Sequence, residues 1–359
     1  MDSKQKYKVI GVMSGTSLDG VDLAYCTFSY KNGWQFIVQF SETVEYSGNW
    51  AKKLSTVHQL SAPDLLKFDV SYGEYIGSLC QNFISKNKIK KVDFISSHGH
   101  TVFHQPENRF TLQIGDGNAI HAVTGLPVVF DFRSLDVSRG GQGAPLVPVG
   151  DKFLFHEFDV CLNLGGIANL STDQKKVRIA FDVCYVNMGL NHLTKKIKKK
   201  FDPQGQLASL GEVNQKLLKA LDSEYSKLKL KRPSLGREFF ERSIQPLLDN
   251  ESIAINDRLR TFTESSAKEI ASTILEFGKN KTVLCTGGGV LNTFLMYRLI
   301  EHCGDDATLI IPEKEIINFK EAIVFAFLGL LRVRGEANCL KSVTGATQNS
   351  SAGLMIGKF

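Results

Sequence analysis

The chain has 359 residues, which is longer than one hydrophobic core usually grows, so two domains of ordinary size are expected. Hydrophobic residues make up 43% and charged residues 22%, a composition that excludes a disordered or fibrous chain and is typical of a globular enzyme. The formal net charge of +6 comes with no recognised nucleic-acid-binding module, so nucleic acid is not expected as a partner, whereas a mildly basic protein suits anionic substrates.

The cysteines and the apolar runs indicate the compartment. The seven cysteines are odd in number, lie far apart and never form a C-x-x-C pair, which indicates reduced thiols. The first residues, MDSKQKYK, are polar, and the longest apolar run, residues 322–331, is far shorter than a membrane span requires. The sequence therefore predicts a cytoplasmic protein with no membrane partner.

The first part of the chain is predicted to be a sheet with helical cover. A small polar turn, SGTSLDG, separates the first two strand-like runs, so the chain opens with a β-hairpin. Apolar residues spaced by three and four over residues 65–83 predict a long amphipathic helix. Strands are predicted at residues 7–13, 21–28, 34–40, 92–96 and 126–132.

The second part repeats the opening device. The segment CLNLGGIANLS again places a glycine pair between two strand-like runs. A helix over residues 267–277, a strand over 282–285, the loop TGGG and a helix from about residue 292 follow, and residues 320–331 form a last apolar helix. No fixed-period repeat occurs. We therefore expect an internally duplicated α/β architecture with two lobes.

The turn of the first hairpin is the strongest candidate for a phosphate site. Gly, Thr and Ser let backbone amides and hydroxyls approach phosphate oxygens, and an acidic residue, here Asp19, can hold the metal that accompanies a nucleotide. An ordinary polar turn is the alternative, and no Walker A motif occurs in the chain. The predicted ATP contacts of this turn are Gly15, Thr16, Ser17, Leu18, Asp19, Gly20, Val21 and Asp22.

Two further glycine clusters are candidates for the rest of the nucleotide. The glycine pair in NLGGIANL can bind the terminal phosphate through backbone amides, as proposed for the first turn. The segment TGGG lies between a strand and a helix, where glycine lets the backbone approach the planar ring of adenosine. A helix-entry turn is an equally good reading of the triple glycine. The predicted nucleotide contacts here are Gly165, Gly166, Gly287, Gly288, Gly289 and Asn292.

Basic side chains follow two strands of the first lobe. His98, His100 and His104 in SHGHTVFHQP are expected on a loop, and their spacing is not that of a standard zinc site, which favours substrate contact or packing, with His98 the candidate for the substrate. Arg133 ends a strand and leads into a glycine-rich loop, a suitable place for binding an anionic or hydroxyl-rich ligand.

Two carboxylates are candidates for chemistry. Asp182 ends the strand-like run VRIAFD, and a carboxylate at the end of a strand can point into a cleft between lobes, although a surface turn is also compatible with it. Glu321 opens an apolar helix, where it serves the helix dipole or faces the cleft, and the pattern does not choose between these roles.

These residues lie in segments through which the chain resembles the anhydro-N-acetylmuramic acid kinase family of the actin, hexokinase and heat-shock ATPase superfamily. The resemblance covers essentially the whole length. The segments that carry it are GVMSGTSLDGVD, SHGHTVFH, TLQIGDGNAIHAVTG, DFR, GGQGAPLVP, LNLGGIANLS, PSLGREFF, CTGGGVLN, KEAIVFAF and VTGAT.

The resemblance implies a fold and a reaction. The fold is a two-lobed, actin-like ATPase fold of the ribonuclease H type, α/β in class, in which each lobe is a mixed sheet flanked by helices and the active-site cleft lies between the lobes. The lobes are expected at residues 1–135 and 136–344, with a tail at 345–359 that packs back on the first lobe. A homodimer is implied as well.

The implied reaction opens a 1,6-anhydro sugar with water and transfers the γ-phosphate of ATP to O6, with Mg²⁺ as cofactor. In the anhydro sugar O6 is tied to C1 and carries no proton, so the base has to activate water. Asp182 matches the family's aspartate for this role, and Arg133 and Glu321 match positions that the family places near the sugar.

Two departures from the family pattern stand out. Many relatives follow the catalytic aspartate with Thr-Gly-Pro-Gly-Asn, whereas here residues 183–187 read VCYVN, and His100 stands where relatives often have glutamine. A kinase of an ordinary amino sugar is the alternative enzyme. An actin-like ATPase that grips a polypeptide is the alternative of another class, but it predicts an added peptide-binding domain for which no segment remains.

Overall fold

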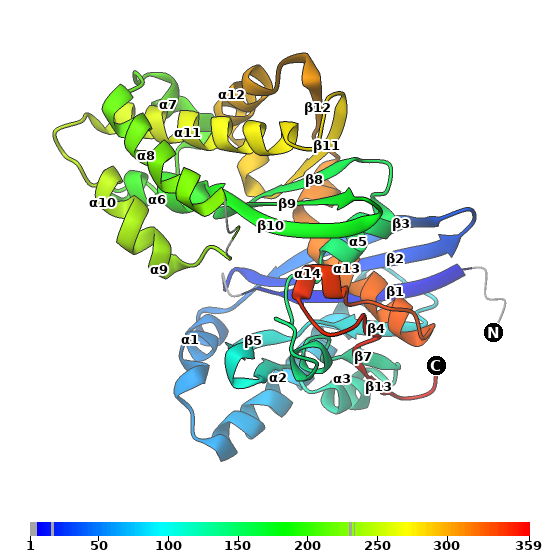
Figure 1. Cartoon of the computed structure of the whole chain (residues 1–359). Helices are drawn as coiled ribbons and strands as arrows, with labels where there is room; N and C mark the ends of the chain where they lie inside the picture. The colour runs from blue at the N-terminus through cyan, green and yellow to red at the C-terminus, as the bar shows by residue number, and fades with distance from the viewer. Residues whose placement is uncertain (1–5, 16–17, 230–231, 233) are drawn as a thin grey trace. The chain divides into compact units, whose positions relative to one another are not determined.

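The computed structural model describes residues 6–15, 18–229, 232 and 234–359 (Figure 1). The chain divides into two compact units, of which the first contains Met1–Leu154 with Phe319–Phe359 and the second contains Phe155–Asn318. Among the helices of the described residues, none is long and apolar enough to cross a membrane.

The first unit is built on a six-stranded mixed sheet in the order β13-β7-β4-β1-β2-β3. The pairs β1–β2 and β2–β3 are antiparallel, β1–β4 and β4–β7 are parallel, and the C-terminal strand β13 pairs antiparallel with β7. The strands are β1 (Lys6–Ser14), β2 (Gly20–Tyr30), β3 (Trp34–Glu45), β4 (Phe94–Ser97), β7 (Val128–Phe130) and β13 (Leu354–Ile356), with a separate hairpin of β5 (His100–Gln105) and β6 (Phe110–Ile114).

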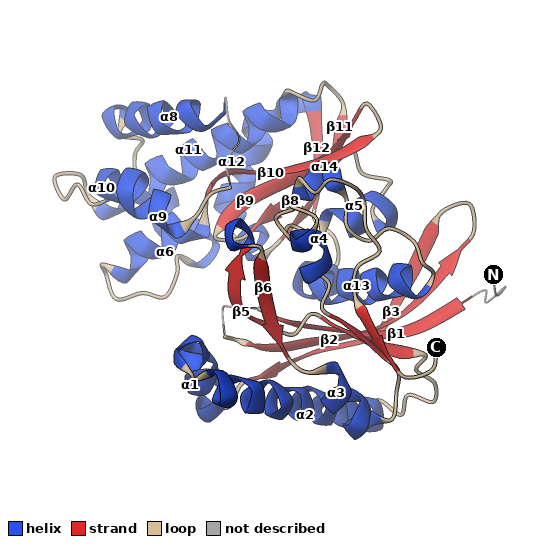
Figure 2. Cartoon of the chain, turned by 60° about the horizontal axis from the view of Figure 1, so that its bottom comes forward, coloured by secondary structure: helices blue, strands red, loops and turns tan. Residues whose placement is uncertain are grey.

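Helices cover both faces of this sheet. The long helix α2 begins where Ser61 caps its first turn, and it lies alongside α3 on one face (Figure 2). On the other face α13 approaches β1 so closely that a Cβ on Gly11 would lie 2.0 Å from the carbonyl oxygen of Ala322. The helices are α1 (Gly48–Thr56), α2 (Ala62–Lys86), α3 (Gly117–Thr124), α4 (Ser134–Ser138), α5 (Pro148–Leu154), α13 (Lys314–Val333) and α14 (Lys341–Thr344).

The second unit has a five-stranded sheet in the order β10-β9-β8-β11-β12. Its first two pairs are antiparallel and its last two are parallel, which is the same pattern as β3-β2-β1-β4-β7 in the first unit. The strands are β8 (Val160–Leu164), β9 (Ile167–Gln174), β10 (Val177–Tyr185), β11 (Lys281–Thr286) and β12 (Ala307–Ile310).

The core of the second unit lies between this sheet and its helices. Most of α11 is buried, because α6, α7, α8 and α12 all pack against it. A π-helical turn, Phe240–Ile244, joins the short helices α9 and α10. The helices are α6 (Asn187–Lys195), α7 (Gln206–Ser209), α8 (Gln215–Lys229), α9 (Arg237–Phe239), α10 (Gln245–Leu248), α11 (Ile255–Leu275) and α12 (Thr293–Cys303).

The predicted α/β class, with a mixed sheet flanked by helices in each part, is confirmed. The observed units differ in extent from the predicted lobes, since residues 136–154 and 319–344 group with the first unit. The reason is packing: a Cβ on Gly150 of α5 would lie 2.3 Å from the side chain of Val324 in α13, and α13 lies against β1. The predicted histidine loop was wrong in part, because His100 and His104 lie in β5, which pairs with β6.

Candidate active site

The predicted phosphate turn connects β1 to β2 in a tight reversal. Thr16 and Ser17 lie outside the described residues. Leu18 has a φ of 60°, and its N–H donates to the carbonyl oxygen of Gly15 at 3.5 Å. A left-handed conformation is rare for a bulky residue, and such backbone strain is concentrated at ligand-binding sites. The geometry of the turn is therefore compatible with the predicted phosphate site.

The base of this turn is fixed from both sides. The buried hydroxyl of Ser14 donates to the carbonyl oxygen of Gly99 at 3.0 Å and accepts from the hydroxyl of Tyr72 at 2.9 Å. Gly20 is required by packing, since a Cβ there would lie 2.4 Å from the carbonyl oxygen of Val44 in β3. The close approach of β3 therefore explains the glycine at position 20 without any contact to a ligand.

Two carboxylates flank the turn. Val21 points into the core, whereas Asp22 is half-buried and accepts a hydrogen bond from the Thr43 hydroxyl at 2.5 Å. Burial raises the pKa of Asp22, the Thr43 hydroxyl lowers it, and the negative charge of the exposed Asp19 raises it further. The pair is therefore a place where a cation would be stabilised.

The half-buried Arg133 and the buried His98 form a polar pair in the first unit. The Nε–H of Arg133 donates to Nε2 of His98 at 3.0 Å, and Nδ1 of His98 is 2.9 Å from the carbonyl oxygen of Gly99. Because Nε2 accepts, the proton of a neutral ring is on Nδ1, which donates to Gly99. Burial and the guanidinium of Arg133 hold the pKa of His98 well below its ordinary value, so the ring is neutral.

The glycine-rich loop that follows Arg133 is held by a buried carboxylate. Arg133 Nη1 donates to the carbonyl oxygen of Gly143 at 2.7 Å. Asp136 accepts from the backbone N–H of Gly143 at 2.9 Å and from the hydroxyl of Thr344 at 2.9 Å. This network joins the segments DFR, GGQG and VTG and fixes the direction of the guanidinium.

Glu321 in α13 completes the charged group of the first unit. Its side chain is exposed to solvent. Desolvation raises the pKa of Glu321, Arg133 lowers it and Asp22 raises it. Glu321 is therefore within electrostatic range of both Arg133 and Asp22, and His98 is linked to Glu321 through Arg133.

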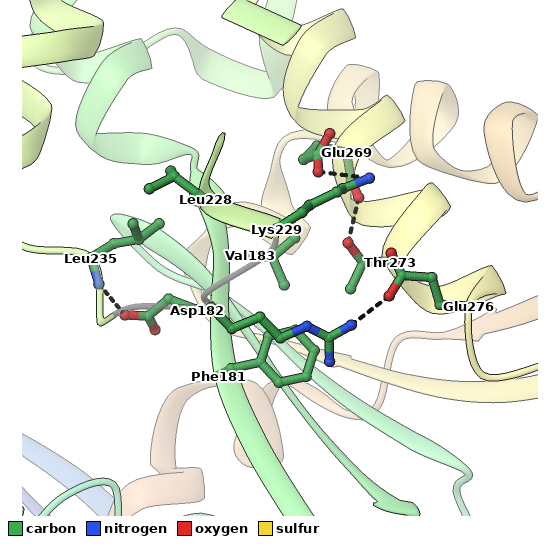
Figure 3. Close-up of a pocket in the computed structure, with 10 residues that line it drawn as sticks. Phe181, Asp182, Val183, Leu228, Lys229, Leu235, Glu269, Thr273 and Glu276 are labelled. Carbon is green, nitrogen blue, oxygen red and sulfur yellow. Dashed lines mark hydrogen bonds and ion pairs between the residues drawn. The ribbon is translucent and has the colours of Figure 1, made fainter. Parts of the chain in front are cut away.

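Asp182 lies at an irregularity of β10 in the second unit. Asp182 pairs with Asn169, Cys184 pairs with Ala168, and Val183 between them is an extra residue, which makes a β-bulge. Bulges next to active sites re-aim side chains. The backbone N–H of Leu235 donates to Asp182 Oδ2 at 2.8 Å, as Figure 3 shows.

The electrostatics of Asp182 are set by opposing effects. Burial raises the pKa of the carboxyl, whereas the N–H of Leu235 and the side chain of Ser234 lower it by hydrogen bonding. The two donors belong to the segment PSLGREFF, whose role the sequence did not reveal. That segment is anchored by the Tyr185 hydroxyl, which donates to the carbonyl oxygen of Gly236 at 2.7 Å.

A small pocket adjoins Asp182 on the helix side of β10 (Figure 3). Lys229 pairs with Glu269 at 2.9 Å, and Arg232 pairs with Glu276 while its guanidinium lies 4.0 Å from the ring centroid of Phe181. Both cationic side chains of the pocket are therefore paired with carboxylates. The lining residues are Phe181, Asp182, Val183, Leu228, Lys229, Arg232, Leu235, Glu269, Thr273 and Glu276.

The run that departs from the family pattern is part of the core. Residues 183–186 are all buried, and they form the end of β10 and the entry to α6. The backbone N–H groups of Val186 and Met188 donate to the carbonyl oxygen of Gly166, and that of Asn187 donates to Gly165. The carbonyl groups of the glycine pair are therefore used to start α6.

The two glycine loops of the second unit lie side by side. They follow the parallel strands β8 and β11, in which Asn163 is paired with Thr286. Gly287 needs glycine for its φ of 84°, and a Cβ on Gly289 would lie 2.7 Å from Cβ of Leu164.

At three other glycines of these loops, neither a positive φ nor close packing requires glycine. A Cβ on Gly165 or Gly166 would make only ordinary contacts, and one on Gly288 would meet nothing within 4 Å. These three positions can leave room for a ligand. The predicted contact Asn292 caps α12, because its side chain accepts from the N–H of Leu295 at 3.0 Å.

Comparison with known proteins identifies the family. The family model "Anhydro-N-acetylmuramic acid kinase" matches residues 7–358. An anhydro-N-acetylmuramic acid kinase of Sulfurimonas denitrificans is 32% identical over 96% of this chain and 98% of its own length, and one of a Sulfurovum species is 34% identical over 98% and 99%.

Among solved structures, the activator of the 2-hydroxyisocaproyl-CoA dehydratase from Clostridium difficile with bound ADPNP aligns over 91% of this chain and 97% of its own, with a TM-score of 0.44 and 14% identity. The full-length family match and the two kinases with more than 30% identity decide the assignment. The chain belongs to the anhydro-N-acetylmuramic acid kinase family.

Proposed function

We propose that the protein is an ATP-dependent kinase that opens 1,6-anhydro-N-acetylmuramic acid with water and phosphorylates O6, giving N-acetylmuramic acid 6-phosphate and ADP. Membership of the family supports this reaction. The observation that carries it is Asp182, a partly buried carboxylate on a β-bulge whose Oδ2 is held by a backbone donor.

Asp182 acts as the general base of the first step. It takes a proton from water, the water oxygen bonds to C1, and the C1–O6 bond breaks with its electron pair going to O6. Burial raises the pKa of Asp182, which makes the carboxylate a stronger base, while Leu235 and Ser234 keep it ionised. The hydrogen bond at Oδ2 fixes the carboxylate's orientation.

Phosphoryl transfer follows from the charge that O6 gains. O6 attacks the γ-phosphorus and the bond to the β-phosphate oxygen breaks, which releases ADP. Alignment and neutralisation of charge dominate this step. We assign the phosphates to the turn from Gly15 to Asp22 and to Gly165 and Gly166, and the adenosine to the 287–289 loop with Asn292.

Arg133 and Glu321 are assigned to the sugar. The guanidinium of Arg133 is fixed by Gly143 and His98 and lies close enough to Glu321 to affect its pKa. His98, predicted as a sugar contact, has both ring nitrogens engaged within the protein. We therefore assign it to positioning Arg133.

The nucleotide's Mg²⁺ fits the carboxylate pair of the first unit. Asp19 and Asp22 repel each other, and Mg²⁺ in kinases is typically held by one or two carboxylates together with phosphate oxygens and water. Asp19, the predicted ligand, and Asp22 would hold the ion. When bound, it would neutralise charge on the phosphates.

The cellular setting completes the proposal. An anhydro amino sugar of this kind is a fragment of the cell wall, so the reaction belongs to peptidoglycan recycling. We propose that it takes place in the cytoplasm, where ATP is available and the seven buried cysteines, which form no disulfide, stay reduced. We extend to this chain the homodimer that the family resemblance implies.

The substrate is tested by incubating the protein with ATP and either 1,6-anhydro-N-acetylmuramic acid or N-acetylglucosamine. ADP release and product mass are followed. We expect a product from the anhydro sugar alone, heavier by one phosphoryl group and one water. Activity only on the free amino sugar would replace this proposal with the alternative kinase.

A further inference from the structure

Two asparagines of the second unit make no side-chain hydrogen bond within the described part of the chain. Asn163 and Asn169 are directly paired across β8 and β9, and Asn169 is in turn paired with Asp182 of β10. Directly paired residues share one face of a sheet. The register therefore places Asn163, Asn169 and Asp182 in one row across three strands.

Asparagine is an unusual choice at these positions. Both strands are interior to the sheet, where asparagine is disfavoured. Asn163 and Asn169 are only half-buried, and within the described residues neither side-chain amide donates or accepts a hydrogen bond. Cys161 lies two residues before Asn163 on the same face of β8, and both Cys161 and its cross-strand partner Ser171 are buried. This face of the sheet is therefore covered at Cys161 and Ser171 and becomes accessible at Asn163 and Asn169.

The surroundings of each amide indicate its ligand. Asn163 lies between the two glycine loops, because a Cβ on Gly287 would be 2.6 Å from its Oδ1 and a Cβ on Gly165 would be 3.6 Å from its Nδ2. Asn169 is the cross-strand neighbour of Asp182, and directly paired residues have Cβ atoms about 5 Å apart.

We infer that Asn163 binds the transferred phosphoryl group and that Asn169 binds the anhydro sugar beside the water activated by Asp182. The –NH₂ of an amide donates to phosphate oxygen, and the whole amide can both donate to and accept from a sugar hydroxyl. The inference rests on the proposed function. It adds two ligand-binding residues from strands where the sequence indicated only a sheet.

The experiment compares Asn163→Ala, Asn163→Asp and Asn169→Ala with the unaltered enzyme. Losing one hydrogen bond to a ligand is expected to cost about tenfold in affinity. Asn163→Ala should weaken binding of ADPNP, a non-hydrolysable ATP analogue that keeps the terminal phosphoryl group, by about that factor in calorimetry, and leave ADP binding within about twofold. Asn163→Asp should weaken ADPNP binding further, because a negative charge then faces the terminal phosphate. Asn169→Ala should raise KM for the sugar about tenfold and leave KM for ATP within about twofold.

Gln174→Ala is the matched control, since Gln174 is an exposed residue at the end of the same strand β9. If Asn169→Ala does not fold, Asn169→Asp keeps the shape of the side chain. Its added charge should raise the pKa of Asp182 and move the acidic limb of kcat/KM to higher pH. Asn169→Asp should also raise KM for the sugar, because a carboxylate cannot donate to a sugar hydroxyl, whereas a purely structural asparagine would leave that KM unchanged.

The inference is overturned if the asparagine variants keep the kinetic and binding constants of the control, or if Asn169→Ala affects ATP and not the sugar. Failure of the proposed function is a separate result. In that case the unaltered protein would bind ADPNP without turning over the anhydro sugar, and the ADPNP arm would still test Asn163.

Discussion

At the scale of single residues, the chemistry depends on how two charged side chains are held. Asp182 accepts hydrogen bonds from a segment more than fifty residues away in sequence, and Arg133 is fixed by His98 and Gly143. In both cases the reactive or binding group is buried enough for its neighbours to control its pKa or direction. Small changes in those neighbours should therefore have specific kinetic signatures.

Ser234 is expected to set the pH range of activity. Its side chain lowers the pKa of Asp182, so Ser234→Ala should raise that pKa further. Because the base works only when ionised, the acidic limb of the pH profile of kcat/KM should move to higher pH. Ser234→Thr, which keeps the hydroxyl, should restore the original limb. An unmoved limb in Ser234→Ala would mean that Leu235 alone holds the carboxylate.

His98 is expected to act through Arg133. His98→Ala removes the acceptor of the Arg133 Nε–H, so KM for the sugar should rise about tenfold while KM for ATP changes little. His98→Gln has one acceptor and one donor and should recover part of the loss. Equal loss in the two variants, with KM for ATP raised as well, would argue against a positioning role.

At the scale of elements, strand ends and turns carry the predicted nucleotide contacts. The glycine hairpins could be recognised in the sequence because turn chemistry is local: a Gly-rich segment between two strand-like runs is a hairpin wherever it occurs. The bulge at Val183 could not be recognised, since it depends on which residues of β9 pair with β10. Likewise, the local sequence of β5 indicates a loop, whereas pairing with β6 makes it a strand.

The triple glycine offers a matched pair of substitutions. A Cβ on Gly289 would lie 2.7 Å from Leu164, so Gly289→Ala should destabilise the fold by about 1–3 kcal/mol in chemical denaturation. Gly288 has open space, so Gly288→Ala should change stability by less than about 0.5 kcal/mol but weaken ADP binding. Normal ADP affinity in Gly288→Ala would remove this loop from the nucleotide site.

At the scale of the whole molecule, one strand pattern is used twice. The two sheets share their order and directions over five strands, and both place a glycine turn after the first strand. The sequence predicted this duplication, but not the extent of each unit. Residues 319–344 follow the second unit in the chain and belong to the first, because α13 packs against β1, a contact that no local pattern reveals.

Asp182 is the residue on which the proposed reaction depends most. The central claim is that water attacks C1 while O6 receives the phosphoryl group, with Asp182 as the base. Asp182→Asn should therefore abolish turnover, by at least about a thousandfold, and leave ADP binding within about twofold, because the amide cannot take the proton.

The most direct test is turnover of 1,6-anhydro-N-acetylmuramic acid and ATP in oxygen-18-labelled water, with the product read by fragment mass before its C1 hydroxyl exchanges. The account predicts one labelled oxygen at C1, an unlabelled phosphate on O6, and no product from Asp182→Asn. Label in the phosphate group, or full turnover by Asp182→Asn, would contradict it.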